Sequence, residues 1–244
     1  MSLPVFLSEA VTAASPGAQI VLDGDEGRHA ATVKRIRTGE RIVLTDGAGT
    51  SATCSVSDAT KSSLTVRVES VEHAERLLPH VTVVQAIPKG DRGELAVEML
   101  TEIDVDRIVP WAAARSVAVW RGDRATKSLA KWRGAARSAA KQARRSWLPE
   151  VTEPASTDEV SRLLADADLA VVLHEDASVP LAALSLDGVG SVVVVVGPEG
   201  GLSDDEVAAF SSADVVRLGS SVLRTSTAGV AAVAAILSRT TRWS

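Results

Sequence analysis

The 244-residue chain has a single cysteine, no tyrosine and few aromatic side chains, which make up 3% of its residues. One cysteine, Cys54, cannot form an internal disulfide or a cysteine-rich metal site, so we expect a reducing compartment. No apolar run approaches the roughly 20 residues that cross a bilayer, and the segment from Met1 to Leu7 lacks the features of a secretion signal. We therefore expect a cytoplasmic protein that does not enter a membrane.

Several signatures of nucleotide and metal chemistry are also missing. The sequence contains neither the Gly-x-Gly-x-x-Gly pattern of dinucleotide-binding folds nor the phosphate-binding loop of ATPases. The four histidines have no zinc-ligand spacing, and no nucleophile elbow marks a serine hydrolase. We predict that the protein holds no metal ion.

The charge of the chain is unevenly distributed. The net charge is -5 and the pI is near 5.5, which taken alone argues against a nucleic-acid partner. Between Arg121 and Trp147, however, nine basic residues stand against one acidic residue, Asp123. An acidic body with one basic element is typical of a protein that docks a polyanion at one face.

Two sequence patterns divide the chain. Short strand-like runs such as Arg41 to Thr45 and Ser63 to Val68 alternate with turns up to about residue 72, which favours a small β-barrel. From Val81 onward, continuous apolar runs alternate with helical stretches, as in a parallel α/β sheet whose strands are buried on both faces. We predict two domains, residues 1–74 and 75–244.

The basic segment has the spacing of an amphipathic helix. Its apolar residues recur every three or four positions, at Leu129, Trp132, Ala136, Ala139, Ala143 and Trp147. Such a pattern fits a solvated surface helix, but charges of one sign lack the acidic partners that usually stabilise one. Two interpretations of this segment therefore stay open: a helix that binds RNA and an ordinary solvated surface helix.

Two junctions between strands and helices indicate a ligand site. The apolar run Val192 to Val196 leads into Gly197-Pro198-Glu199-Gly200-Gly201, and Ser203 to Glu206 reads as a capping box that opens a helix. Glycines at the carboxyl end of a parallel strand let backbone N–H groups approach a ligand closely. The alternative is a tight turn with no ligand.

The second junction follows Val215 to Leu218. Gly219 begins a polar loop that ends at Arg224, and Thr225 or Ser226 is expected to cap the helix that contains Val230 to Leu237. An arginine near a buried helix start needs an anion or a carbonyl as partner, although a surface acid would serve equally well.

Taken together, these segments resemble the bacterial 16S rRNA (uracil-N3)-methyltransferase family of the SPOUT, or trefoil-knot, superfamily. The matching motifs are His29 to Gly47, Gln85-Ala86-Ile87-Pro88-Lys89-Gly90-Asp91-Arg92, Glu102 to Val105, Ala139 to Pro149, Val196 to Ser203, and Leu218 to Thr225. The resemblance implies an α/β protein in which a PUA-like RNA-binding β-barrel precedes a SPOUT domain with a C-terminal trefoil knot. It also implies a homodimer.

The resemblance further implies that S-adenosyl-L-methionine is the cofactor and that N3 of one uridine in 16S rRNA, or in the small ribosomal subunit, receives the methyl group. Arg224 is the candidate donor to the anion that develops on the uracil, and Glu199 is a weaker candidate for the base. The family commonly has a glutamate where this chain has Ser226, so no base is assigned there. The implied cofactor-binding residues are Leu173, His174, Gly197, Pro198, Glu199, Gly200, Gly201, Leu218, Gly219, Val222, Leu223, Thr225 and Ser226.

The RNA-binding candidates are the basic and polar residues of the barrel, of the Pro-Lys-Gly-Asp-Arg motif and of the basic helix. They are His29, Lys34, Arg35, Arg37, Lys89, Arg92, Arg137, Lys141, Gln142, Arg144 and Arg145. Two rival functions stay open: a knotted methyltransferase acting on tRNA or on a ribose 2'-hydroxyl, and a non-catalytic RNA-binding protein of ribosome assembly.

Overall fold

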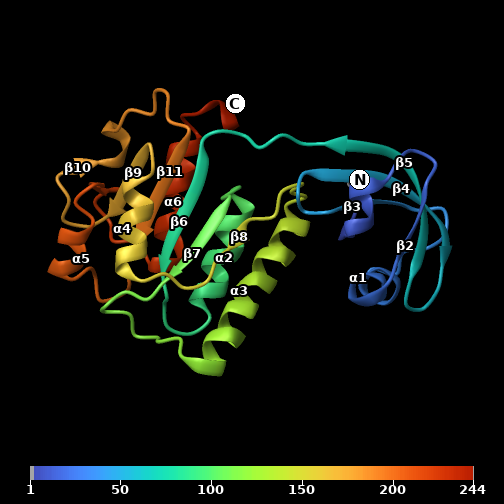
Figure 1. The fold of residues 1–244 in the computed structure, drawn as a ribbon, viewed down its shortest axis with the longest axis horizontal. Coiled ribbons are helices and arrows are strands. Elements are labelled where there is room, and N and C mark those ends of the chain that lie inside the picture. The colour runs from blue at the N-terminus through green and yellow to red at the C-terminus, as the bar shows by residue number, and fades with distance from the viewer. Residues whose placement is uncertain (1–2, 244) are drawn as a thin grey trace. The chain divides into compact units, whose positions relative to one another are not determined.

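The computed structural model describes residues 3–243 (Figure 1). The strands are β1 (Val5–Leu7), β2 (Gln19–Leu22), β3 (Arg41–Thr45), β4 (Thr50–Ala59), β5 (Leu64–His73), β6 (His80–Ala86), β7 (Arg107–Trp111), β8 (Glu150–Val151), β9 (Leu169–Leu173), β10 (Val179–Pro180), β11 (Ser191–Val196) and β12 (Asp214–Arg217). The α-helices are α1 (Gly24–Arg28), α2 (Arg92–Glu102), α3 (Gly122–Gln142), α4 (Thr157–Ala165), α5 (Asp204–Ala209) and α6 (Thr225–Leu237).

The chain divides into two compact units. The first comprises Met1–Arg76 together with Ala140–Leu148, and the second comprises Leu77–Ala139 together with Pro149–Ser244. We expected one boundary, between residues 74 and 75. In the structure a later segment, Ala140–Leu148, also belongs to the first unit. This segment includes the last residues of α3 and the turn after it, where the Trp147 indole N–H donates to Ala74 O at 2.9 Å.

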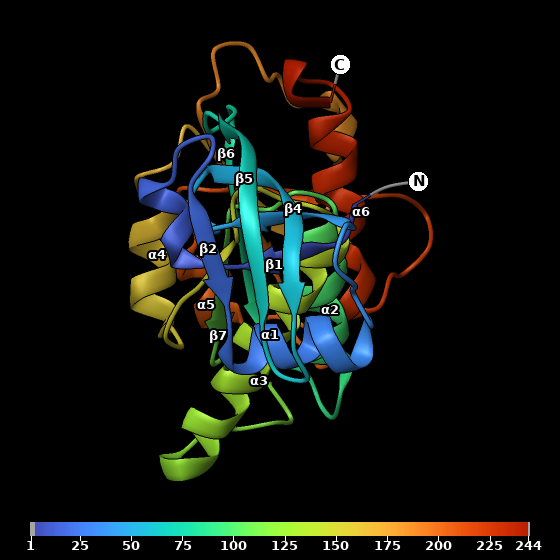
Figure 2. The same ribbon diagram turned by 90° about the vertical axis from the view of Figure 1, so that its right-hand side faces the viewer.

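The first unit contains a curled five-stranded sheet in the order β1-β3-β4-β5-β2 (Figure 2). Strands β3, β4 and β5 pair in antiparallel fashion, and the β4–β5 pair contains two register shifts that allow the sheet to bend. Alternate residues of these strands are buried, including Ile42, Leu44, Cys54 and Val66. The predicted strand at Arg41–Thr45 is confirmed, and the predicted strand that begins near residue 63 extends to His73 as β5.

The second unit contains a seven-stranded parallel sheet in the order β10-β12-β9-β11-β6-β7-β8. Strand β11 lies inside it, between β9 and β6. The prediction of a parallel α/β sheet is confirmed. The implied trefoil knot stays a prediction.

Alternating residues of the apolar strands bury opposite faces of this sheet. Val192, Val194 and Val196 of β11 belong to a core cluster with residues of α2, α3 and α6. Val193 and Val195 point to the other face and pack with residues of α4 and with Phe210 after α5. Helices therefore cover both faces, which explains why the strands are continuously apolar (Figure 1). No helix of the described residues is long and apolar enough to cross a membrane.

Two of the predicted helix boundaries are wrong. The apolar stripe of the basic helix is confirmed from Leu129 to Ala139, all of it buried, but α3 ends at Gln142, so that Ala143 and Trp147 lie beyond it. Helix α6 begins at Thr225 with Arg224 as its N-cap residue, so neither Thr225 nor Ser226 is the cap. The cap has no side-chain hydrogen bond, because the arginine occupies the position at which a short polar side chain would accept one.

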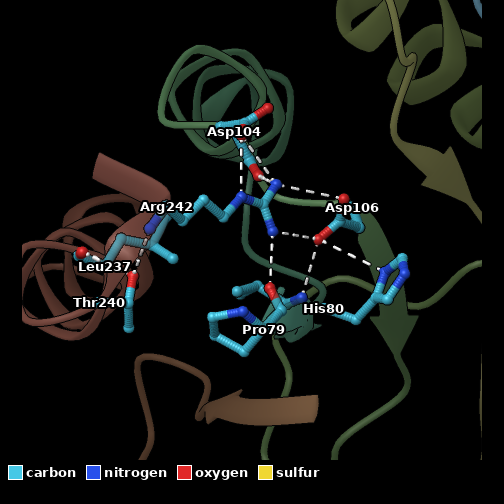
Figure 3. Close-up of polar contacts among 8 residues, drawn as sticks. Pro79, His80, Asp104, Asp106, Leu237, Thr240 and Arg242 are labelled. Atoms are coloured by element: carbon cyan, nitrogen blue, oxygen red, sulfur yellow. Dashed lines mark hydrogen bonds and ion pairs between the residues drawn. The ribbon is translucent and has the colours of Figure 1, made fainter. Parts of the chain in front are cut away.

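A buried arginine joins the C-terminal segment to the starts of two strands (Figure 3). Arg242 is 3% exposed in its side chain, and its guanidinium donates to Asp104 Oδ2 at 2.8 Å, to Asp106 Oδ2 at 2.7 Å and to Pro79 O at 2.7 Å. Burial alone lowers the pKa of Arg242, but the hydrogen bonds and charges of Asp106 and Asp104 outweigh it and raise that pKa. The Asp106 carboxylate also accepts the Val81 N–H at 2.8 Å, so it fixes the start of β6.

Replacing this arginine removes the guanidinium that pairs with both Asp104 and Asp106. We expect Arg242→Met to lower the free energy of unfolding by about 3 kcal/mol, since removing one partner of a buried ion pair leaves the others uncompensated. Denaturant unfolding measures this loss. Arg162→Met is the control, because Arg162 is exposed on α4 and has no buried ion pair within residues 3–243. Similar unfolding energies for the two variants would contradict the role assigned to Arg242.

Candidate cofactor site

The carboxyl ends of three parallel strands surround a cavity of about 630 Å³ in the second unit. The cavity is lined by loops that follow β9, β11 and β12, and by the start of α6. Its size lies within the ~300–1,000 Å³ of common small-molecule sites. The two ligand loops predicted at Gly197 and Gly219, and the implied third loop at Leu173, therefore meet in one place.

The loop after β11 is shaped by its glycines and by the helix that follows. Gly201 has φ +69°, a conformation that side chains with a Cβ rarely adopt. A Cβ on Gly200 would lie 3.1 Å from Arg115 Cβ and 3.2 Å from Arg115 O, so a larger residue there would displace backbone. The predicted capping box is confirmed, since Ser203 accepts the Glu206 N–H at 3.2 Å and Glu206 accepts the Ser203 N–H at 2.8 Å.

Glu199 connects this loop to the loop after β6. Its Oε1 accepts the Lys89 backbone N–H at 3.3 Å and lies 3.8 Å from Arg92 Nη1. Arg92 also lines the cavity, although the sequence suggested it only as an RNA contact. Glu199 therefore has two partners within the protein, which favours an orienting role for its carboxylate.

The start of α6 offers polar groups to the cavity. The hydroxyl of Thr225 is buried and has no hydrogen-bond partner among residues 3–243, and Thr225 lines the cavity. Arg224 is exposed, and its side chain makes no ion pair or hydrogen bond within the described part of the chain. The anion, carbonyl or surface acid that the sequence led us to expect as its partner is therefore not found among the described residues.

The third loop contributes His174, whose Nδ1 accepts the Asp176 N–H at 3.2 Å. A neutral His174 ring that accepts at Nδ1 has its proton on Nε2. Two exposed acids, Glu175 and Asp176, follow it and also line the cavity.

Most of the cofactor residues named from the sequence lie around this one cavity. Of that set, Ser226 does not line it and is 4% exposed on α6. Sequence reasoning did not name several lining residues, among them Arg115, Val196, Leu202, Val216, Arg217, Ser220, Ser221 and Ala228. Arg115 had no local signal, because it reaches the cavity through a loop after β7 that contains no glycine pattern.

The RNA-binding candidates are found in both units. In the first unit, Lys34, Arg35 and Arg37 are exposed, and His29 is half-buried with its ring 6.2 Å from that of Phe6. In the second unit, Lys89 is exposed, whereas Arg92 is half-buried and Arg137 is exposed. Four consecutive exposed positions, 32–35, cover the end of a short helix (His29–Val33) and the two residues after it.

Two of the candidate RNA contacts, at the end of α3 and just after it, are partly or fully buried. Lys141 Nζ donates to Glu26 Oε1 at 2.8 Å, and both side chains are largely buried. Arg145 is 8% exposed, so it is a buried residue of the first unit. Gln142 and Arg144 remain exposed. The expectation that Lys141 and Arg145 offer free charges to RNA is not supported by this arrangement.

Arg144, in the turn after α3, has a left-handed backbone conformation. Its φ is 56°, and the N–H groups of Arg144 and Arg145 donate to Lys141 O at 3.2 Å and Ala140 O at 2.9 Å. This is the Schellman motif, in which glycine is the usual residue at the left-handed position. Arg144 is therefore exposed and lies beyond the end of the helix that carries most of the other basic residues.

Comparison with known proteins places these features in one class. Residues 75–237 match the model of an RNA methyltransferase domain, and residues 22–69 match that of an RNA methyltransferase PUA domain. The curled sheet and the parallel sheet therefore belong to an RNA methyltransferase with a PUA domain.

The relatives identify the family. Ribosomal RNA small subunit methyltransferase E of Mycobacterium tuberculosis is 46% identical over 233 residues, which cover 93% of this chain and 89% of that protein. The protein of the same name from Bacillus subtilis is 31% identical over 225 residues, with 88% of each chain covered. The chain belongs to the ribosomal RNA small subunit methyltransferase E family, which confirms the resemblance read from the sequence.

Solved structures share the whole fold. That of ribosomal RNA small subunit methyltransferase E from Neisseria gonorrhoeae, bound to S-adenosyl methionine, has a TM-score of 0.86 and 26% identity and covers 97% of this chain and 98% of that one. A Legionella pneumophila protein in complex with the same cofactor has a TM-score of 0.83 and 27% identity, with 98% of each chain covered.

Gly200 provides a direct test of the cavity. We expect Gly200→Val to abolish measurable binding of S-adenosylmethionine, because the new side chain displaces the Arg115 backbone and fills the loop. Isothermal titration calorimetry measures the affinity. Gly134→Ala is the control, since a Cβ there meets nothing within 4 Å. Unchanged affinity in the valine variant would remove this loop from the site.

Proposed function

We propose that the protein transfers the methyl group of S-adenosylmethionine to N3 of one uridine in 16S rRNA. The observation that supports this most directly is the convergence of the three strand-end loops on a single cavity in a chain of this family. The cofactor, when bound, supplies a methyl group on a sulfonium that is itself the leaving group. What the protein adds is the binding, the orientation and the handling of charge.

The residues present fit such a cofactor. The loop after β11 brings backbone close to the cavity at Gly197 and Gly200, and the buried Thr225 hydroxyl has hydrogen-bonding capacity that no described protein group uses. A buried hydroxyl without a partner is costly, so a ligand group at this position would relieve it. Apolar side chains at Leu173 and Leu218 line the same cavity and suit the flat, less polar parts of the ligand.

Arg224 is the proposed donor to the substrate. N3 must lose its proton, here to water, before it attacks the methyl group, and the uracil oxygens share the negative charge until the new bond forms. An arginine at the rim of the cavity, with no partner in the described protein, can meet that charge without breaking an existing interaction. Glu199 is the proposed orienting residue between two loops, and the position of the family glutamate, Ser226, is buried on α6.

The acceptor atom also imposes a requirement on the RNA. N3 lies on the Watson–Crick edge, so the uridine must be unpaired or flipped out of a stack before it can reach the cavity. A separate PUA domain that holds neighbouring RNA would supply the binding energy for this step. We propose as part of the same function that the protein acts in the cytoplasm and forms a homodimer. Analytical ultracentrifugation would test the oligomeric state.

The function is tested by the modification itself. Small-subunit RNA from cells that lack this protein is digested and analysed by mass spectrometry for 3-methyluridine. We expect the nucleoside to be absent and to return when the wild-type protein is supplied. Persistence in full would overturn the proposal, and loss of a tRNA or ribose methyl group instead would favour the rival enzyme.

Arg224→Ala tests the proposed catalytic role. We expect kcat for methyl transfer to fall by about 100-fold or more, the usual cost of removing a donor to a developing anion. Affinity for S-adenosylmethionine, measured by calorimetry, should change little. Arg162→Ala is a control on an exposed helix. If Arg224→Ala weakens cofactor binding and leaves kcat unchanged, the arginine is a cofactor ligand and not a donor to the substrate.

The exposed arginines of the first unit test RNA binding. We expect the double reversal Arg35→Glu and Arg37→Glu to weaken binding of small-subunit RNA by at least tenfold at low salt, because phosphate contacts depend on these charges. Filter binding measures the RNA affinity, and calorimetry should show an unchanged affinity for the cofactor. Equal losses for both ligands would indicate misfolding. Arg162→Glu, which reverses one exposed charge in the second unit, measures the effect of net charge for a single reversal.

A further inference from the structure

The loop after β7 forms an additional wall of the cavity. Arg115 lies in this loop and lines the cavity, and its Nη1 donates to Gly200 O at 3.4 Å. The close approach is also made by the backbone, since a Cβ on Gly200 would lie 3.2 Å from Arg115 O. The shape of the glycine loop therefore depends on where the loop after β7 is held.

A buried carboxylate binds the backbone of the loop after β7. Glu206, the third residue of α5, is 3% exposed, and its Oε1 accepts the Ala114 N–H at 2.7 Å. Its other oxygen, Oε2, accepts the Ser203 N–H at 2.8 Å. No ion pair to Glu206 exists within residues 3–243. The two oxygens of one carboxylate thus connect two loops through backbone N–H groups.

A second capping box in the same domain shows that capping alone does not require this arrangement. Glu159 of α4 accepts from both Ser156 N and Ser156 Oγ at 2.8 Å, in each case through Oε2. Within the described residues Glu159 accepts no hydrogen bond from another loop, and it belongs to an exposed helix start. The Oε1 contact of Glu206 is therefore additional to helix capping.

We propose that Glu206 is a positioning residue of the cofactor site. Through Ala114 it fixes the loop after β7, this loop presses Arg115 against Gly200, and that contact keeps the glycine loop in the shape that binds the cofactor. The inference rests on the proposed function only for the identity of the ligand, S-adenosylmethionine.

The conservative variant Glu206→Gln separates the two oxygens. A glutamine side chain has one acceptor oxygen and one NH2 donor, so it satisfies only one of the two N–H groups and faces the other with a donor. In Glu159→Gln, by contrast, the single amide oxygen can replace Oε2 and the NH2 group points to water. The two variants therefore change the same residue type at the third position of a helix. We expect only the change at Glu206 to weaken cofactor binding.

Calorimetric titration with S-adenosylmethionine is the experiment, with each variant as the full chain. We expect Glu206→Gln and Arg115→Ala each to weaken cofactor binding about tenfold, and Glu159→Gln to stay within about twofold of wild type. The double variant Glu206→Gln/Arg115→Ala should bind no more weakly than the weaker single variant, because both act through one contact.

Each result is decisive. Wild-type affinity in Arg115→Ala overturns the inference even if Glu206→Gln fails to fold, which a thermal melt would reveal. Additive losses in the double variant also overturn it, since Glu206 would then act by another route. Equal losses in Glu206→Gln and Glu159→Gln would indicate that helix capping alone is responsible. Absence of cofactor binding by the wild-type protein would instead refute the proposed function.

Discussion

The parallel pairing of β11 with strands on both sides is the constraint on which the site depends. β11 pairs with β9 through residues 192–195 and with β6 through residues 191–196, and β9 in turn pairs with β12. Parallel strands begin at one edge of a sheet and end at the other, so the loops that follow them meet at the carboxyl edge. Loops that are 20 or more residues apart in the chain become neighbours there, and the cavity is the space they enclose.

The same constraint determines how the helices must pack. A strand that is buried on both sides needs apolar residues at every position, and the run from Val192 to Val196 provides them. Helix α6 approaches this strand closely: a Cβ on Gly229 would lie 3.0 Å from Val196 Cγ2 and 3.4 Å from Val83 Cγ1. A larger residue would push the helix away from β6 and β11. Because α6 begins at the cavity, its distance from the sheet also sets the position of Thr225.

Buried strands and a helix capping box could be predicted well from the sequence, whereas contacts between distant segments could not. Unbroken valines predicted buried strands, and the capping box at Ser203 and Glu206 was recognised from its spacing alone. Nothing in the sequence indicated that the second oxygen of Glu206 reaches Ala114, because a contact over 92 positions leaves no periodic signal. The boundary of α3 was missed for a related reason, since Arg144 adopts a backbone conformation that usually calls for glycine. Lys141 was expected to be free because its partner, Glu26, lies in another part of the first unit.

The charges around the cavity suit two ligands of opposite charge. S-adenosylmethionine carries a sulfonium cation, whereas RNA is a polyanion, and one cavity has to serve both. The acids Glu175 and Asp176 follow β9, while Arg217 and Arg224 flank the loop after β12. Arg92 and Arg115 already have contacts within the protein, so their charges are partly used by Glu199 and by Gly200 O. Arg224 has no such contact among the described residues, and its charge is therefore available for a uracil that is negative once N3 has lost its proton.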